Sequence, residues 1–155
     1  MRRALRLAGR RKLISRIPRF ELLPGEHSRE FVLSRKLEPH YFAACPEPLR
    51  SVAELIVNAG LRVGEALSLQ WPDVHLKPVG AATRGYIHVR TGKSHNAKRN
   101  ISLTKRSTAL LKRLQATAIG PYVFVREDRL SPLSRFTLED QHKKAREALN
   151  LAATL

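Results

Sequence analysis

The sequence predicts an α+β fold that is mainly helical, with a small antiparallel β-sheet in its middle. Apolar residues recur at helical spacing before residue 70 and again after residue 104. Between these stretches, residues 86–90 (YIHVR) are rich in β-branched and aromatic side chains, and residues 101–103 form a second short strand-like stretch. The chain has 155 residues, of which 43% are hydrophobic, so it is long and apolar enough to bury a core.

The first part of the chain predicts a basic helix, a linker and two further helices. Residues 1–17 combine arginines with interrupted apolar positions and predict a short helix. Residues 18–32 contain Pro24-Gly25 and no helical period, which is typical of a linker or extended arm. Ser34 is suited to cap a helix that continues to residue 44. A second helix is expected from residue 49 up to Gly60, which suits the position just after a helix end.

The middle of the chain predicts a short helix followed by a β-hairpin. Residues 63–69 continue the helical pattern after Gly60. We expect Trp71 to pack this helix against the sheet. Pro72-Asp73 then predicts a turn. The two strand-like stretches flank a turn-rich segment, TGKSHNAK, so they predict two neighbouring strands or a hairpin. The hairpin would carry Lys93 at its tip.

The last part of the chain predicts two helices. Thr104 is suited to cap a helix that places four apolar side chains on one face, Leu110, Leu111, Leu114 and Ala118. Gly120-Pro121 should end that helix. Residues 122–125 predict a third strand or a short extended segment, and residues 138–149 a final amphipathic helix.

The charge of the chain points to a polyanionic partner. Lysine and arginine together number 29 against 13 acidic residues, a formal charge of +16. Such an excess favours double-stranded DNA or another nucleic acid over a small-molecule substrate or a membrane surface. A ribosomal-type RNA-binding protein would share this composition. No apolar run approaches the length needed to span a bilayer. The single cysteine, Cys45, suits a reducing cytoplasm. We expect the chain to associate there with the nucleoid.

The stretch NAGLRVGEALSLQW places an arginine in the elbow between two apolar helical segments. Arg62 would lie at the start of the second helix, where unpaired backbone N–H groups and the helix dipole favour an anion. Its guanidinium could then grip a phosphate through two parallel hydrogen bonds. Glu65 lies on the same helical face and could orient Arg62. The alternative is an ordinary solvated ion pair between these two side chains.

Several cations crowd the predicted hairpin turn. Lys93 lies between Gly92 and Ser94, and Lys98 and Arg99 close the same turn. A lysine at a turn tip could enter a groove of DNA and give a proton or a charge to a phosphate oxygen. The alternative is a loop that only adds affinity by contacting the DNA backbone.

These two motifs resemble the tyrosine recombinases, the phage integrase family. The segment AGLRVGEALSLQWPDV resembles that family's first arginine box, and RTGKSHNAKRNISLT its lysine-bearing β-hairpin. The resemblance implies that residues 1–33 form the end of a core-binding domain with its linker. It implies that residues 34–155 form the first part of the catalytic domain.

The resemblance also implies a chemistry. In this family a tyrosine attacks a DNA phosphodiester, arginines and a histidine stabilise the charge that develops, and a lysine protonates the leaving hydroxyl, without a metal or other cofactor. Arg62 would be the first arginine, Glu65 its acidic neighbour and Lys93 the lysine, while Lys98 and Arg99 would add DNA contacts. Homo-oligomers or an intact recombinase on the same DNA would be further partners.

The sequence departs from the family pattern in its second half. None of its six histidines is followed three residues later by arginine, so the His-x-x-Arg box is absent. The last tyrosine, Tyr122, precedes the final predicted helix, and Tyr86 is better explained as a residue packed in the sheet. We therefore expect an incomplete catalytic domain that binds DNA without cleaving it. The alternative is a stand-alone basic DNA-binding module or a regulator of an intact integrase.

Overall fold

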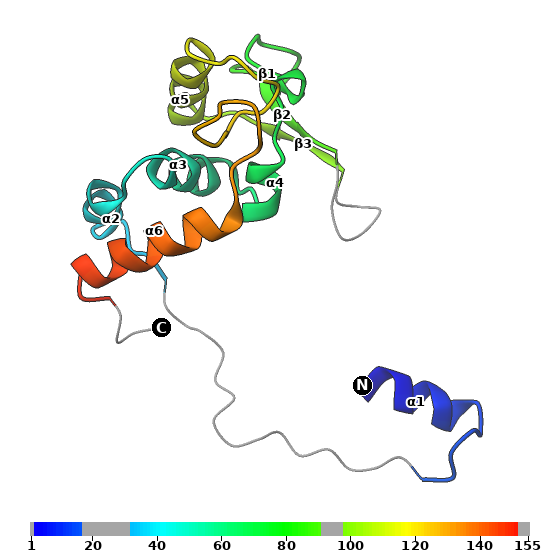
Figure 1. The fold of residues 1–155 in the computed structure, drawn as a ribbon. Coiled ribbons are helices and arrows are strands. Elements are labelled where there is room, and N and C mark those ends of the chain that lie inside the picture. The colour runs from blue at the N-terminus through cyan, green and yellow to red at the C-terminus, as the bar shows by residue number, and fades with distance from the viewer. Residues whose placement is uncertain (1, 17–31, 91–97, 152–155) are drawn as a thin grey trace. The chain divides into compact units, whose positions relative to one another are not determined.

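The computed structural model describes residues 2–16, 32–90 and 98–151 (Figure 1). Contacts along the chain divide it into two units, residues 1–31 and 32–155. The first unit contains helix α1 (Arg2–Arg10), which confirms the predicted basic helix over a shorter span. The predicted linker, except for Val32, lies outside the described residues. No described helix has the length and apolarity that a bilayer crossing requires.

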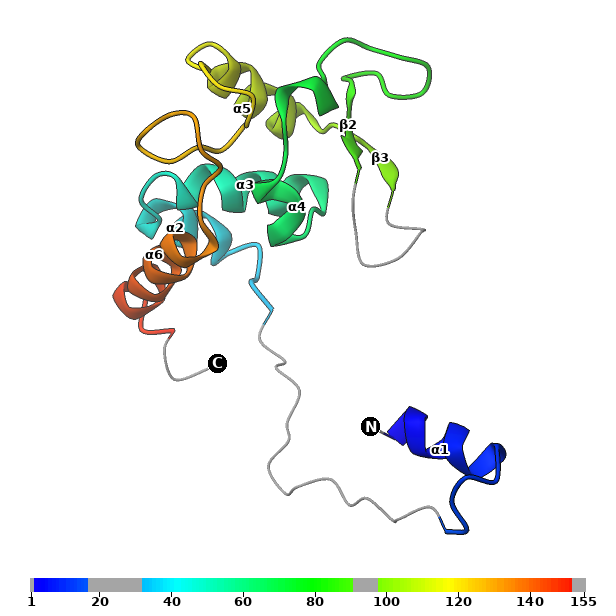
Figure 2. The same cartoon turned by 45° about the vertical axis from the view of Figure 1, so that its right-hand side comes forward.

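The second unit is built around helix α3 (Leu49–Ala59). Helices α5 (Lys105–Gln115) and α6 (Arg135–Ala148) lie on opposite sides of it in both views (Figures 1 and 2). Helix α2 (Glu38–Ala44) packs against both α3 and α6. Val52 and Leu55 of α3 are almost completely buried, so this helix supplies the centre of the core.

A three-stranded antiparallel sheet lies beside these helices. Its order is β1 (Val74–His75), β2 (Tyr86–Val89), β3 (Arg99–Ser102). Ile87 and Val89 of β2 are buried whereas Tyr86 and His88 are only partly buried, the alternation expected of a strand with one face on the core. Tyr86 stacks on His75 with ring centroids 4.3 Å apart, which agrees with its interpretation as a sheet residue.

Helix α6 is fastened to the turn between α2 and α3 by side-chain hydrogen bonds. The Gln141 side chain accepts from the Leu49 backbone N–H and donates to the Glu47 carbonyl, both at 3.1 Å. The Tyr41 hydroxyl and His142 Nδ1 are 2.7 Å apart. Burial raises the pKa of Tyr41 and lowers the pKa of His142, so both side chains are neutral near pH 7.

The predicted caps of the later helices are confirmed. Helix α3 ends at Gly60, whose φ of 65° is in the left-handed region, and Thr104 Oγ1 accepts from the Ser107 N–H at the start of α5. Helix α6 begins at Arg135, three residues before the predicted start at residue 138, and the Ser134 side chain, which was not predicted as a cap, accepts from the Thr137 N–H.

Other predicted boundaries are wrong for local reasons. Ser34 caps only a turn, and the α-helix that follows begins at Glu38, with Pro39 in its first turn. Ala118 is exposed beyond the end of α5. Residues 122–125 form a short extended segment with isolated bridges at Tyr122 and Val125, which is the second of the two predicted alternatives, and the third strand of the sheet is β1.

Candidate functional site

The residues before and after Arg62 in the chain fix the elbow that carries it. Gly60 closes α3 by donating its N–H to the Ile56 carbonyl at 2.8 Å. Leu61 is buried in the core, so the chain is anchored directly before Arg62. Arg62 is extended (φ −75°, ψ 153°) and precedes α4 (Val63–Leu67). Its side chain is 75% exposed, because the anchored backbone directs it away from the core.

One carboxylate holds the elbow in this shape. Glu65 Oε2 accepts from the Arg62 backbone N–H at 2.9 Å, and Oε1 accepts from Arg62 Nη1 at 2.9 Å. The predicted pairing of Arg62 and Glu65 is therefore confirmed. The predicted anion site at the helix N-terminus is not supported, because the Arg62 N–H is already paired with Glu65 and α4 has only five residues. Any phosphate would be bound by the guanidinium instead.

Arg99, at the start of β3, binds the same carboxylate. Its Nη1 donates to Glu65 Oε1 at 2.9 Å and its Nη2 to Oε2 at 2.8 Å, a bidentate pair. The Glu65 side chain is only 7% exposed, and that of Arg99 is 32% exposed. The hydrogen bonds from Arg99, with those from the Arg62 backbone and side chain, hold the pKa of Glu65 at about 2 against its ordinary 4.5. Glu65 is therefore ionised throughout the neutral range.

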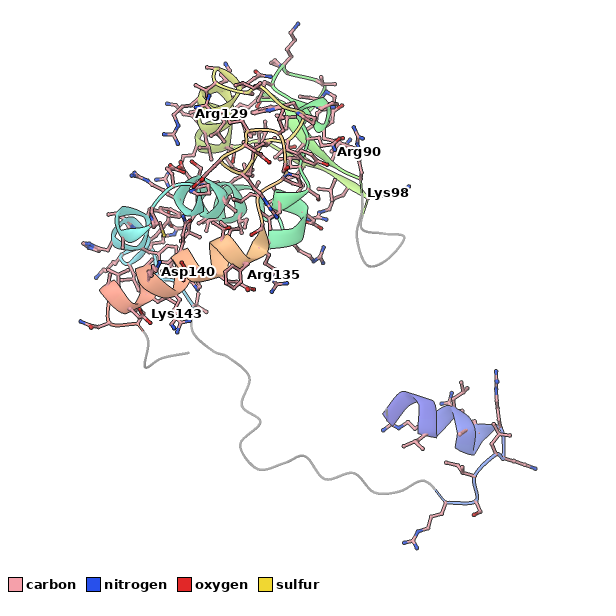
Figure 3. All side chains as sticks on the ribbon, viewed as in Figure 1. Arg90, Lys98, Arg129, Arg135, Asp140 and Lys143 are labelled. Carbon is pink, nitrogen blue, oxygen red and sulfur yellow. The ribbon has the colours of Figure 1, made fainter. Side chains whose placement is uncertain are left out.

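Of the two predicted lysines, only Lys98 lies within the described residues. Lys98 is exposed at the open end of the β2–β3 pair, where Figure 3 labels it together with Arg90. Lys93 lies outside the described residues, so its position relative to Arg62 stays a prediction.

A second ion pair, which was not predicted, lies near Glu65. Asp73, in the short 3-10 helix η1 (Trp71–Asp73), is buried and accepts from Arg90 Nε at the end of β2. With Glu65 and His88, these residues line an open pocket of about 200 Å³. His88 Nδ1 is 2.7 Å from the Asn100 side chain on β3. The Trp-Pro-Asp turn was the only sequence signal for this pair, because its arginine is distant in sequence.

The arrangement can bind an anion but offers no metal centre in the part described. Arg62, Arg90, Lys98 and Arg99 bring four positive charges against the two carboxylates of Glu65 and Asp73. Within residues 2–16, 32–90 and 98–151, no three His, Cys, Asp or Glu side chains gather as a metal site. Excess positive charge with outward guanidinium groups suits a phosphate.

Comparison with solved structures shows the same fold in recombinases. The integrase of transposon Tn1549 in complex with circular intermediate DNA aligns with a TM-score of 0.71 at 13% identity, over 97% of this chain and 55% of that one. A lambda integrase bound to DNA gives 0.66 at 24% identity, over 97% and 54%. XerA recombinase gives 0.60 at 18%, over 83% and 46%. The chain thus spans about half the length of these structures.

Comparison with protein families gives the assignment. No curated protein sequence matches the chain. The family model described as "Phage integrase family" matches residues 36–155, which include the Arg62 elbow, the hairpin and helix α6. This match agrees with the α+β fold and with the residues that carry the resemblance in the sequence. The chain therefore belongs to the phage integrase family, the tyrosine recombinases.

Proposed function

We propose that this chain is a DNA-binding part of a site-specific tyrosine recombinase, in which Arg62 binds a phosphate of double-stranded DNA. The proposal rests on the exposure of the Arg62 side chain and on the single hydrogen bond that its guanidinium makes with Glu65. Nη1 is held by Glu65, whereas the side chain as a whole is 75% exposed, and its other nitrogens have no hydrogen-bond partner among the described residues. A guanidinium fixed at one corner and open at the others is prepared to bind a phosphate without a large loss of side-chain entropy.

The rest of the proposal follows the family. In intact members, DNA strands are cut and rejoined through a phosphotyrosine link. Lys93 is proposed to occupy the position of the lysine that protonates the leaving hydroxyl in those intact members, and Lys98 to contact the DNA backbone. The Tn1549 and lambda integrase structures are complexes with DNA, which supports DNA as the partner of this chain as well. Further copies of the chain or an intact recombinase are proposed to share that DNA.

Strand cleavage is not part of the proposal for these residues. The sequence has no His-x-x-Arg, and Tyr86 is stacked on His75 in the sheet. We propose residues 1–33 as the end of a core-binding domain with its linker and residues 34–155 as catalytic-domain structure. We also propose that the chain acts in the cytoplasm on nucleoid DNA.

Arg62→Ala is expected to weaken binding of a duplex oligonucleotide by about 10- to 100-fold, because one well-formed charged hydrogen-bonding group contributes roughly 1.5–3 kcal/mol. Fluorescence anisotropy at a fixed salt concentration would measure this loss. The matched control is Arg84→Ala, which removes the same charge from an exposed arginine that forms no ion pair within the described part of the chain. The proposal is wrong if both variants lose the same affinity, since only net charge would then matter.

A further inference from the structure

We propose that Arg99 is a positioning residue, which holds Glu65 and through it keeps the Arg62 guanidinium directed outward, and that Arg99 does not itself contact DNA. The inference rests on the proposed function, because it assigns Arg62 as the phosphate-binding group. It also departs from the expectation, drawn from charge alone, that Arg99 is one of the DNA contacts.

The geometry of the carboxylate carries the proposal. An ionised carboxylate accepts about four hydrogen bonds. Here all four come from two residues: the backbone N–H and Nη1 of Arg62, and Nη1 and Nη2 of Arg99, at 2.8–2.9 Å. Glu65 is therefore saturated, and Arg62 is required to supply only one of its guanidinium nitrogens.

Burial makes the contribution of Arg99 necessary. A carboxylate that is 7% exposed cannot be solvated by bulk water, so it must be compensated by protein donors. Without Arg99, two acceptor positions of the buried Glu65 carboxylate would remain unfilled, and Arg62 would be its only cationic partner among the described residues. The flexible, exposed Arg62 side chain would then turn inward to satisfy them. A second guanidinium nitrogen committed to Glu65 would be lost to the phosphate.

The position of Arg99 in the fold explains why it can hold the elbow. It is the first residue of β3 and lies 34 positions after Glu65, so the ion pair ties the sheet to α4. Both of its terminal nitrogens point at the carboxylate, and two-thirds of its side chain is covered. These are the features of a side chain directed into the protein. Lys98, its neighbour, is exposed and is the better candidate for a backbone contact.

The experiment compares the full chain with Arg99→Gln, Arg99→Lys and the charge-matched control Arg84→Gln. Duplex DNA affinity is measured at several salt concentrations, and the Glu65 carboxyl is titrated by NMR in each protein. For Arg99→Gln we expect about a tenfold loss of affinity with an unchanged salt slope, and a Glu65 pKa that rises toward its ordinary value of 4.5. Arg99→Lys, which keeps the charge but not the bidentate geometry, should give intermediate values.

Two results would overturn the positioning role. If Arg99→Gln reduces the salt slope by about 0.9, the value for one phosphate contact, and leaves the Glu65 pKa near 2, then Arg99 binds DNA directly. If the control lowers the affinity as much as Arg99→Gln does, the effect is one of net charge. A wild-type chain that binds no DNA would refute the proposed function, and the Glu65 titration would still decide whether Arg99 holds the carboxylate.

Discussion

Gly85→Ala is expected to destabilise the second unit by about 2–6 kcal/mol. Gly85 has φ +89°, a conformation that costs an L-residue roughly 1–3 kcal/mol. A Cβ atom there would lie 1.9 Å from the His75 carbonyl oxygen, so β1 would have to move away from β2, which adds about 1–3 kcal/mol of overpacking. The Gly85 carbonyl also accepts from the Leu103 N–H at 3.0 Å, so the strain would extend to the end of β3.

Urea denaturation would measure this loss, with Gly64→Ala as the matched control. Gly64 lies within α4, and a Cβ there would meet no atom within 4 Å. Alanine has a higher helix propensity, so the control should be neutral or stabilising by up to about 1 kcal/mol. Equal destabilisation by both substitutions would show that the close approach of Gly85 to His75 is not what requires glycine.

Glu65→Gln is expected to destabilise the chain by about 2–3 kcal/mol at pH 7. The substitution keeps the shape of the side chain but removes the charge that pairs with Arg62 and Arg99, and an amide nitrogen replaces one accepting oxygen. Breaking a buried pair by removing one partner costs about 3–5 kcal/mol, and the exposure of the arginines reduces that figure here. The matched control is Glu139→Gln on α6, whose ion pair with Arg135 is exposed and should contribute less than about 1 kcal/mol.

The same pair gives the stability a defined dependence on pH. The pKa of Glu65 is about 2 in the folded chain and has its ordinary value of 4.5 when unfolded, so the unfolded chain binds the proton first. Its contribution is therefore complete above pH 4.5 and is lost as the pH falls toward 2. Denaturation at several pH values should show a steeper acid loss for the wild type than for Glu65→Gln. Parallel curves would contradict the depressed pKa.

The sequence was sufficient to predict the parts of the fold that depend on neighbouring residues. Gly60 and Thr104 mark helix boundaries because their effects act within one helical turn. The Arg62–Glu65 contact was predicted for the same reason, since three positions on a helix place two side chains together. Strand β1 was missed because its two residues have no periodicity of their own and are ordered by pairing with β2.

The parts of the site that depend on tertiary contacts could not be predicted. Charge alone gave Arg99 the same role as Lys98, and only the fold distinguishes them by bringing Arg99 to a carboxylate 34 positions earlier in the chain. The Asp73–Arg90 pair joins two residues 17 positions apart and was missed for the same reason. Net charge therefore predicts only the class of the proposed partner, whereas the roles proposed for the individual cations depend on the structure.

The central claim, that the Arg62 surface binds the phosphate backbone of DNA, is tested most directly by titrating the wild type and Arg62→Ala with duplex DNA at several salt concentrations. The account predicts a steep linear fall of log affinity with log salt for the wild type, with a slope more negative than about −3, and a slope about 0.9 less steep for Arg62→Ala. A wild-type slope near zero, or identical slopes for the two proteins, would contradict it.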